Sequence, residues 1–194
     1  FFFFLLGPVM YIAKVPFKKF LTAVKEPFIL FFSTTSSEAA LPKALQAMES
    51  IGVPRPVVSF VLPLGYTFNL DGTTLYLSLA AVFVAQAAGV QMPIEKQVLM
   101  LITLMLTSKG VAAVPRASLV ILAGTLASFN LPLAGIALIL GVDTLMDMAR
   151  TSVNVFGNCL ASVVLARWEG VFDDKAGEPV VTATETAVAL ETAV

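Results

Sequence analysis

The chain has 194 residues, of which 58% are hydrophobic and 13% charged, and its formal net charge is −1. Soluble domains are less apolar and about twice as charged, and a globule of this size could not bury so much apolar surface. The sequence therefore predicts a membrane protein, and its balanced charge offers no basic field for nucleic acid. The absence of His excludes His-based triads and His-ligated zinc, and a single Cys cannot form an internal disulfide.

The chain begins with an uninterrupted apolar run, from Phe1 to Leu6, without an initiator Met or a basic region before it. A secretory signal peptide has a different pattern. We therefore expect residues 1–16 to be the end of a transmembrane helix that is truncated at its start. The chain would then be the C-terminal half of a longer protein.

Two short polar tips interrupt the apolar sequence. Residues 33–42 read STTSSEAALP, residues 107–115 read TSKGVAAVP, and apolar arms flank both. The arms are shorter than the roughly 20 apolar residues that cross a bilayer. We therefore expect two re-entrant helical hairpins, over residues 17–53 and 94–130, that enter the membrane without crossing it. Ordinary Pro-containing surface loops are the alternative, which the repetition of the pattern disfavours.

A long helix is expected after each hairpin. The first, over residues 54–90, contains Asn69-Leu70-Asp71-Gly72-Thr73, whose turn chemistry predicts an unwound segment at mid-depth. The second is expected over residues 131–168. A hairpin and a helix with a polar centre thus occur twice, which is typical of inverted repeats in transporters. The predicted fold class is an all-α membrane protein with two re-entrant hairpins and two long transmembrane helices.

The distribution of basic residues predicts the orientation. They gather at the base of the first hairpin and after the last helix: Lys14, Lys18, Lys19, Lys43, Arg55, Arg167 and Lys175. Because cytoplasmic loops are enriched in Lys and Arg, this side and the C-terminus are predicted to be cytoplasmic. The sequence then becomes rich in Thr, Ala, Val and Glu without a period. We expect residues 171–194 to be a cytoplasmic tail without stable structure.

The last predicted helix carries a polar face between apolar runs. At the helical repeat its members fall within an arc of about 100°: Asp143, Asp147, Arg150, Thr151, Asn154 and Asn158. Charged side chains are costly in lipid, so this face is predicted to point into the protein and to mark a function. A purely structural ion pair is the alternative, but the Thr and Asn residues extend the face beyond what one ion pair needs.

The chemistry of this polar face predicts an acidic amino acid as ligand. Arg150 offers a planar fork that suits a carboxylate, and Asp147 offers a negative charge that suits an ammonium. Thr151 and Asn154 add neutral donors and acceptors. Backbone N–H groups at the hairpin tips can hold a second carboxylate, as helix N-termini do. Aspartate and glutamate carry this combination of groups.

Four motifs, in this order along the chain, carry a resemblance to a known family: SSEAALP, NLDGT, SKGVAAVP and DMARTSVNVFGN. Together they resemble the dicarboxylate/amino acid:cation symporter family, which includes bacterial glutamate/aspartate:proton symporters and the animal excitatory amino acid transporters. The resemblance covers residues 17–168, the family's C-terminal half, without its first five helices and trimerisation scaffold. It implies the transport-domain core of an elevator transporter in the cell inner membrane, not an enzyme, and a homotrimer at full length.

The resemblance implies substrate-binding roles on both hairpins and both helices: Arg150, Asp147, Thr151, Asn154, Ser36, Ser37, Thr73, Gly110 and Val114. Arg150 would bind the side-chain carboxylate and Asp147 the amino group. Asn154 and the tip of the first hairpin would hold the main carboxylate. Asp143 would support Arg150 from behind. The implied partners are a small amino acid and the bilayer, with no nucleic acid, and the sequence indicates no metal site or cofactor other than the coupling ion.

The resemblance also implies cation-coupling positions: Gly65, Thr67, Asn69, Asp71, Ser108, Lys109, Val111 and Asn158. Asn158 stands where sodium-coupled relatives have a carboxylate, and Lys109 places a positive charge beside a sodium site. These departures favour proton coupling over sodium coupling. Because the chain has no His, the proton carrier would be a carboxylate, for which Asp71 and Asp147 are candidates and Glu38 a weaker one.

Other functions stay open at this point. A sodium-coupled symporter for acidic amino acids or for C4-dicarboxylates would use the same segments, although Asp147 argues against a ligand without an amine. A channel or a structural membrane subunit lies outside the transporter class. One asymmetric face of mixed charge fits a single binding site better than a pore lined by repeated rings.

Overall fold

The computed structural model describes residues 2–34, 36–110 and 117–176, and each regular element in these ranges is a helix. Two short turns, the π-helical Phe2–Leu6 and the 3₁₀ turn Ser108–Gly110, accompany eight α-helices. These are α1 (Gly7–Ile12), α2 (Phe17–Thr34), α3 (Ser37–Ser50), α4 (Arg55–Phe68), α5 (Asp71–Ala87), α6 (Ile94–Thr107), α7 (Ala117–Ser128) and α8 (Gly135–Trp168). The predicted all-α class is confirmed for the described part of the chain.

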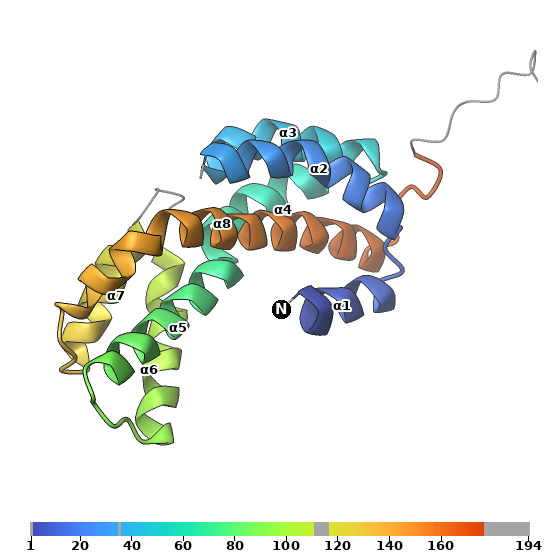
Figure 1. Ribbon diagram of the computed structural model, residues 1–194. Helices are drawn as coiled ribbons and strands as arrows, with labels where there is room; N and C mark the ends of the chain where they lie inside the picture. Colours follow the sequence, from blue (N-terminus) through green and yellow to red (C-terminus); the bar gives the residue numbers. More distant parts are fainter. Residues whose placement is uncertain (1, 35, 111–116, 177–194) are drawn as a thin grey trace, which may run out of the picture.

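The long helix α8 is the element on which two groups of helices pack (Figure 1). Helices α2, α3 and α4 share one apolar core with the C-terminal half of α8. Helices α5, α6 and α7 surround a second core, to which α8 contributes Ile139. Since α8 enters the first core only from Val155 onward, its residues 143–154 lie between the two cores.

The period of apolar residues explains why α2 packs as it does. Phe20, Val24 and Phe31 are buried and recur along one face, while lysines occupy the opposite side. Phe20 meets Phe156 of α8 edge-on, with ring centroids 5.2 Å apart. This aromatic contact fixes the first group of helices against α8.

The segments predicted as hairpins fold as paired helices. Helices α2 and α3 lie side by side (Figure 1), and α6 contacts α7. Ser36 caps α3, because its hydroxyl accepts a hydrogen bond from the Ala39 N–H at 3.4 Å. The tip of the second pair, residues 111–116, lies outside the described residues. The re-entrant placement of both pairs stays a prediction.

The break in the helix expected over residues 54–90 is shorter than the sequence indicated. Only Asn69 and Leu70, between α4 and α5, leave helical geometry, with φ/ψ of −111/70° and −101/60°. Asp71, Gly72 and Thr73, expected in the unwound segment, instead form the first turn of α5. A carboxylate in the first turn of a helix is favoured by the helix dipole, and the free N–H groups of this turn find an acceptor on α8, described below.

The final helix begins at Gly135 rather than at residue 131. Asn130 adopts φ = 55°, a left-handed conformation that Asn tolerates better than most residues, and the chain turns there after α7. The Gly135 N–H bonds the Pro132 carbonyl at 3.1 Å within this turn. The apolar run that continues through residues 117–142 in the sequence is therefore divided between α7 and α8.

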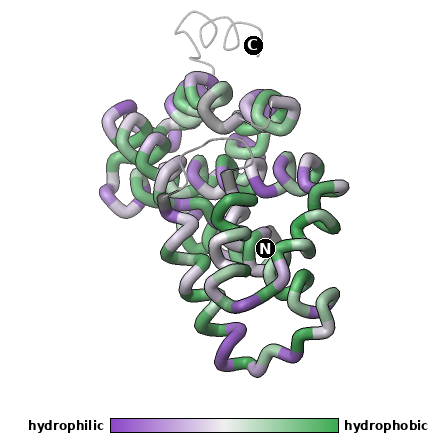
Figure 2. Tube along the Cα trace, turned by 90° about the vertical axis from the view of Figure 1, so that its left-hand side faces the viewer, coloured by the Kyte–Doolittle hydropathy of each residue, from purple (hydrophilic) through white to green (hydrophobic). Residues whose placement is uncertain are grey.

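Apolar residues recur along much of the helical trace (Figure 2), and many large ones are exposed. The large exposed side chains include Phe60, Leu79, Phe83, Leu106, Val120 and Leu138. Among the described residues, one stretch, Arg55–Ala87, which comprises α4 and α5, is long and apolar enough to cross a membrane, and Ser118–Ser128 is a shorter apolar helix. Apolar surface of this extent suits contact with lipid or with further protein.

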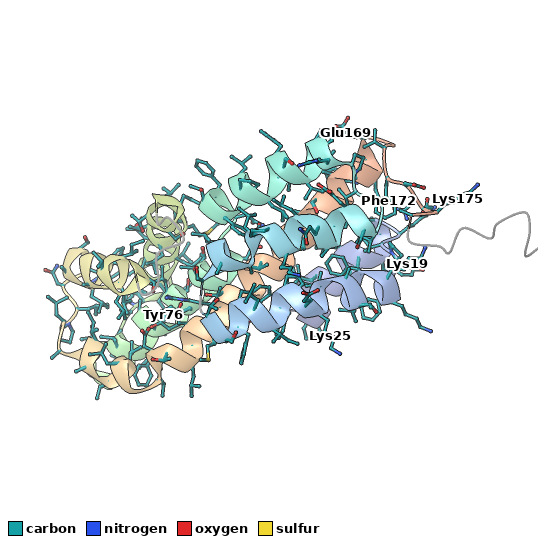
Figure 3. The ribbon with its side chains drawn as sticks, turned by 90° about the horizontal axis from the view of Figure 1, so that it is seen from above. Lys19, Lys25, Tyr76, Glu169, Phe172 and Lys175 are labelled. Carbon is teal, nitrogen blue, oxygen red and sulfur yellow. The ribbon has the colours of Figure 1, made fainter. Side chains whose placement is uncertain are left out.

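Residues 171–176, which the sequence placed in an unstructured tail, pack against the helices instead. The guanidinium of Arg167 donates to both oxygens of Asp174, at 2.5 and 3.0 Å. Phe172 lies against Arg167, with 4.2 Å from Cζ to the ring centroid, and packs on the first core. Figure 3 shows Phe172 near Lys19, at the end of the molecule where α2 begins. The remainder of the expected tail, residues 177–194, lies outside the described residues.

The turn between α3 and α4 receives this C-terminal segment at Gly52. The Asp173 N–H donates to the Gly52 carbonyl at 2.9 Å, and Gly52 has φ = 108°. A Cβ at this position would stand 2.0 Å from the Asp173 carbonyl oxygen. Glycine is therefore required both for the backbone conformation and for the close approach.

We expect Gly52→Ala to lower the free energy of unfolding by about 1–3 kcal/mol or more, because backbone strain and the clash with Asp173 add. Gly89→Ala is the matched control, since Gly89 also has positive φ, 68°, but nothing lies within 4 Å of the added Cβ. Thermal unfolding of both variants in detergent measures the difference. Equal melting temperatures for the two variants would contradict the packing of the C-terminal segment.

Candidate substrate-binding site

The polar face predicted on the last helix is buried inside the protein. Its six members are at most 6% exposed: Asp143, Asp147, Arg150, Thr151, Asn154 and Asn158. They occupy the part of α8 between and beside the two apolar cores. The prediction that this face points into the protein is confirmed, and the side chains divide into a charged cluster and an amide cluster.

The charged cluster is centred on the ion pair between Arg150 and Asp147, one helical turn apart. Arg150 Nε and Nη2 both approach Asp147 Oδ1, at 2.8 and 2.6 Å. Arg150 Nη1 also donates to the hydroxyl of Ser118, at the start of α7. The guanidinium therefore joins α8 to α7 through its in-plane donors.

Tyr76 of α5 completes the charged cluster. The face of its ring lies 4.9 Å from Arg150 Cζ, within the range of cation–π attraction. Its hydroxyl donates to Asp143 Oδ1 at 2.8 Å. Asp143 is thus linked to Arg150 through their common neighbour Tyr76, and the supporting role expected for Asp143 stays a prediction. Figure 3 shows Tyr76 far from the end of the molecule that carries Lys19 and Lys175.

The amide cluster begins at Asn154, whose side chain completes the N-terminus of α5. Asn154 Oδ1 accepts from the N–H of Gly72 at 2.7 Å and from that of Thr73 at 3.4 Å. Its Nδ2 donates to Thr73 Oγ1 at 2.9 Å. Leu70 provides no side-chain cap for α5, so a side chain 82 residues away in the sequence serves instead.

Asn158 lies one turn further along α8 and faces the end of α4. Asn69 Nδ2 donates to Asn158 Oδ1 at 2.8 Å. A Cβ on Gly65 would stand 2.4 Å from the same oxygen, so only glycine leaves room for this pair. The Asn158 Nδ2 is buried and has no hydrogen-bond partner among the described residues. Gly65, Asn69 and Asn158 are thus brought together, as expected.

The other cation-coupling candidates are distributed around the start of α5. Ser108 is fully buried, and its hydroxyl lies 3.1 Å from that of Thr74. Asp71 is half-buried, with its carboxylate beside Gly157 of α8, and Lys109 is close enough to act on it electrostatically. Thr67 is exposed at the end of α4 and lies outside this arrangement.

Several candidates from the two hairpin tips are not joined to the charged cluster by a described contact. Ser36 bonds locally with Thr34 and Ala39. Ser37 begins α3, and Gly110 ends the 3₁₀ turn after α6. Val111 and Val114 lie outside the described residues.

Sequence reasoning missed Tyr76 and Ser118. Tyr76 stands three residues after Thr73, so it shares a face of α5 with a residue that was a candidate. Ser118 is a polar residue at the start of an otherwise apolar helix, and only its position beside Arg150 distinguishes it from other serines. Both could be found only from the way α5 and α7 pack near α8.

The arrangement can bind a ligand that carries acidic and basic groups. One basic side chain and two acidic ones are held at low exposure by hydrogen bonds from three helices. A charged cluster between two apolar cores, in a chain whose described elements are all helices, has the character of a membrane carrier.

A family model confirms this class. The model described as the sodium:dicarboxylate symporter family matches residues 1–168, and the chain belongs to that family. The resemblance inferred from the four motifs is thereby confirmed, and the family is one of membrane transporters rather than enzymes.

Curated relatives extend the comparison. The proton/sodium-glutamate symport protein of Bacillus subtilis (strain 168) is 49% identical over 180 residues, 93% of this chain and 42% of that protein. The proton/glutamate-aspartate symporter of Escherichia coli (strain K12) is 51% identical over 152 residues, 78% of this chain and 35% of that protein. A C4-dicarboxylate transport protein of Erwinia tasmaniensis is 47% identical over 158 residues, 81% of this chain and 37% of that protein. The chain therefore spans about two-fifths of the length of the relatives that it matches.

We expect Gly72→Ala to disrupt the site, because the added Cβ would stand 2.3 Å from the Arg150 carbonyl oxygen and 2.9 Å from Val153 Cβ. The start of α5 would be pushed from α8, and the caps that Asn154 provides would be lost. The variant should lose about 1–3 kcal/mol of stability through those unpaired N–H groups alone.

Gly141→Ala is the control for this substitution, since Gly141 lies in α8 with nothing within 4 Å of an added Cβ. It should leave the melting temperature unchanged or raise it slightly. A Gly72→Ala protein as stable as this control would show that α5 and α8 are further apart.

Proposed function

We propose that the protein is a secondary active symporter that takes up glutamate or aspartate with a cation, and that α8 provides the centre of its substrate site. The observation that carries the proposal is the buried ion pair of Arg150 and Asp147 between the two cores. Relatives named for glutamate and aspartate symport at 49% and 51% identity support it.

The charge pattern explains why an amino acid with two carboxylates is favoured. The guanidinium of Arg150 can hold the side-chain carboxylate through its fork, and Asp147 can accept the ammonium. Thr151 and Asn154 follow on the same face, and Asn154 bonds Thr73 in the first turn of α5. Asn154 and the tip of the first helix pair, with Ser36 and Ser37, would hold the main carboxylate, and Gly110 and Val114 would complete the pocket.

C4-dicarboxylates are the second candidate substrates, because a relative at 47% identity carries that name. Such ligands lack an amine, so they would add negative charge beside Asp147, which is 4% exposed, without an ammonium to balance it. Competition between aspartate and succinate therefore discriminates the two substrates. A site built around Asp147 should prefer aspartate.

Substitution of Arg150 tests the substrate assignment. In the protein expressed from its complete reading frame, we expect Arg150→Gln to reduce uptake of radiolabelled aspartate at least about 100-fold, because a buried charge-assisted pair with the ligand is lost. Neutral amino acids such as serine should gain in relative uptake. Initial rates in vesicles measure both.

Arg55→Gln is the control for that experiment, since Arg55 is exposed at the start of α4. Its uptake should equal that of the unaltered protein. Aspartate uptake that survives Arg150→Gln would remove Arg150 from the substrate site. Non-saturating conductance instead of saturable uptake would favour a channel.

We also propose protons as the coupling ion, with sodium as the alternative. Lys109 places a fixed positive charge near Asp71, where a bound cation would meet repulsion. Asn158 contributes a neutral amide, whereas a hard cation prefers a carboxylate at such a position. Asp71, half-buried beside Gly157, is then the leading carboxylate to carry the proton, ahead of Asp147 and Glu38.

An imposed pH gradient tests this coupling. We expect aspartate uptake into vesicles to follow an inward proton gradient without sodium, and Asp71→Asn to abolish gradient-driven uptake while exchange of internal for external aspartate continues. Exchange requires no net proton movement, so it reports on the intact substrate site. Glu95→Gln, an exposed site in the first turn of α6, serves as the control. Strict sodium dependence of uptake would overturn proton coupling.

The remaining features of the proposal concern the whole protein. An elevator movement of this part against a fixed scaffold, a homotrimer, location in the cell inner membrane and a cytoplasmic C-terminus fit the family and the basic residues near the chain end. The C-terminal segment packs on α2 and α8 at the end of the molecule that carries Lys19, Arg167 and Lys175. The positive-inside rule predicts that the end of the protein rich in such basic residues faces the cytoplasm.

A further inference from the structure

Ser118 links α7 to the charged cluster of α8. It is 2% exposed at the start of α7, and its hydroxyl accepts a hydrogen bond from Arg150 Nη1. The packing contacts of α7 are mainly with α5 and α6. The contact of Ser118 with Arg150 is therefore a polar connection between two elements that share little backbone packing.

The geometry of the guanidinium assigns different roles to its two edges. A planar guanidinium can hold a carboxylate at the Nε/Nη2 edge or at the Nη1/Nη2 edge. Asp147 Oδ1 occupies the first edge, at 2.8 Å from Nε and 2.6 Å from Nη2. The ring of Tyr76 covers one face of the plane, with its centroid 4.9 Å from Cζ. A ligand carboxylate must then approach in the plane, at the Nη1/Nη2 edge.

We propose that Ser118 competes with the ligand carboxylate for this Nη1/Nη2 edge of Arg150, and so acts as a positioning residue that sets the affinity for acidic ligands. The inference deepens the proposed function and rests on it. Binding transfers Nη1 from the neutral hydroxyl of Ser118 to a charged carboxylate, which is the stronger acceptor. The hydrogen bond to the ligand therefore adds to the free energy of binding only by the amount by which it is stronger than the bond to Ser118.

The exchange also connects ligand binding to α7. When the carboxylate takes Nη1, the start of α7 loses its hydrogen bond to α8, while its apolar packing on α5 and α6 remains.

Ser118→Ala tests the competition in the protein expressed from its complete reading frame and purified in detergent. Without the hydroxyl, aspartate should bind about threefold to tenfold more tightly, the typical effect of one net hydrogen bond. The melting temperature without ligand should fall, the ligand-induced rise should increase, and the ligand-bound melting temperature should match that of the unaltered protein. Calorimetric titration and thermal unfolding measure these quantities.

Two variants separate this role from a general effect on packing. Ser118→Thr keeps a hydroxyl and should behave as the unaltered protein. Ser128→Ala removes a hydroxyl from the same helix whose bond to the Gly124 carbonyl, at 2.9 Å, is local. It should change neither affinity nor the ligand-induced rise. If Ser118→Ala does not fold, Ser118→Cys, with a weaker acceptor of similar size, should show the same direction of change.

The outcomes are distinguishable. Weaker aspartate binding by Ser118→Ala would mean that the hydroxyl contacts the ligand, and unchanged binding would mean that it does not compete; either result overturns the inference and leaves the proposed function standing. If aspartate, glutamate and succinate all fail to shift the melting temperature of the unaltered protein, the proposed function falls and the inference falls with it.

Discussion

Two opposite charges are withdrawn from water at the centre of α8, and the rest of the structure is arranged to accommodate them. Removing Arg150 and Asp147 from water costs several kcal/mol for each ion, and their mutual attraction offsets this only when the remaining donors and acceptors are also satisfied. Tyr76 from α5 and Ser118 from α7 supply those partners. The positions of these two helices near α8 are therefore tied to the charged pair.

A second dependence connects the break between α4 and α5 to the same helix. A helix that begins in the interior exposes N–H groups that require acceptors. Asn154 provides one for the start of α5, and Gly72 allows the backbones to approach closely enough for it. Helix α8 thus carries the charged cluster and also stabilises the helix start beside it. A change in the position of α8 would disturb both.

Under the proposed function, this arrangement has consequences for transport. The charges of Arg150 and Asp147 cancel, so a carrier that moves this pair through a low-dielectric region moves little net charge of its own. An acidic amino acid, with two carboxylates and one ammonium, would add one negative charge, which the proposed coupling to a cation would offset. The chain spans about two-fifths of its relatives' length, yet it contains the complete polar face of α8 and the partners from α5 and α7.

The sequence by itself determined the helical class, the two interruptions, and the six-residue face that points inward, because each follows from apolar periodicity and from the cost of charge in lipid. The motifs added the family. Only the tertiary structure decided that Asp71 to Thr73 are helical, that Phe172 returns to the core, and that Ser118 reaches Arg150. Ser118 and Arg150 stand 32 positions apart, and Gly72 and its acceptor Asn154 stand 82 apart. No local pattern encodes such pairs, since they arise when separate helices pack and each buried polar group finds the partner within reach.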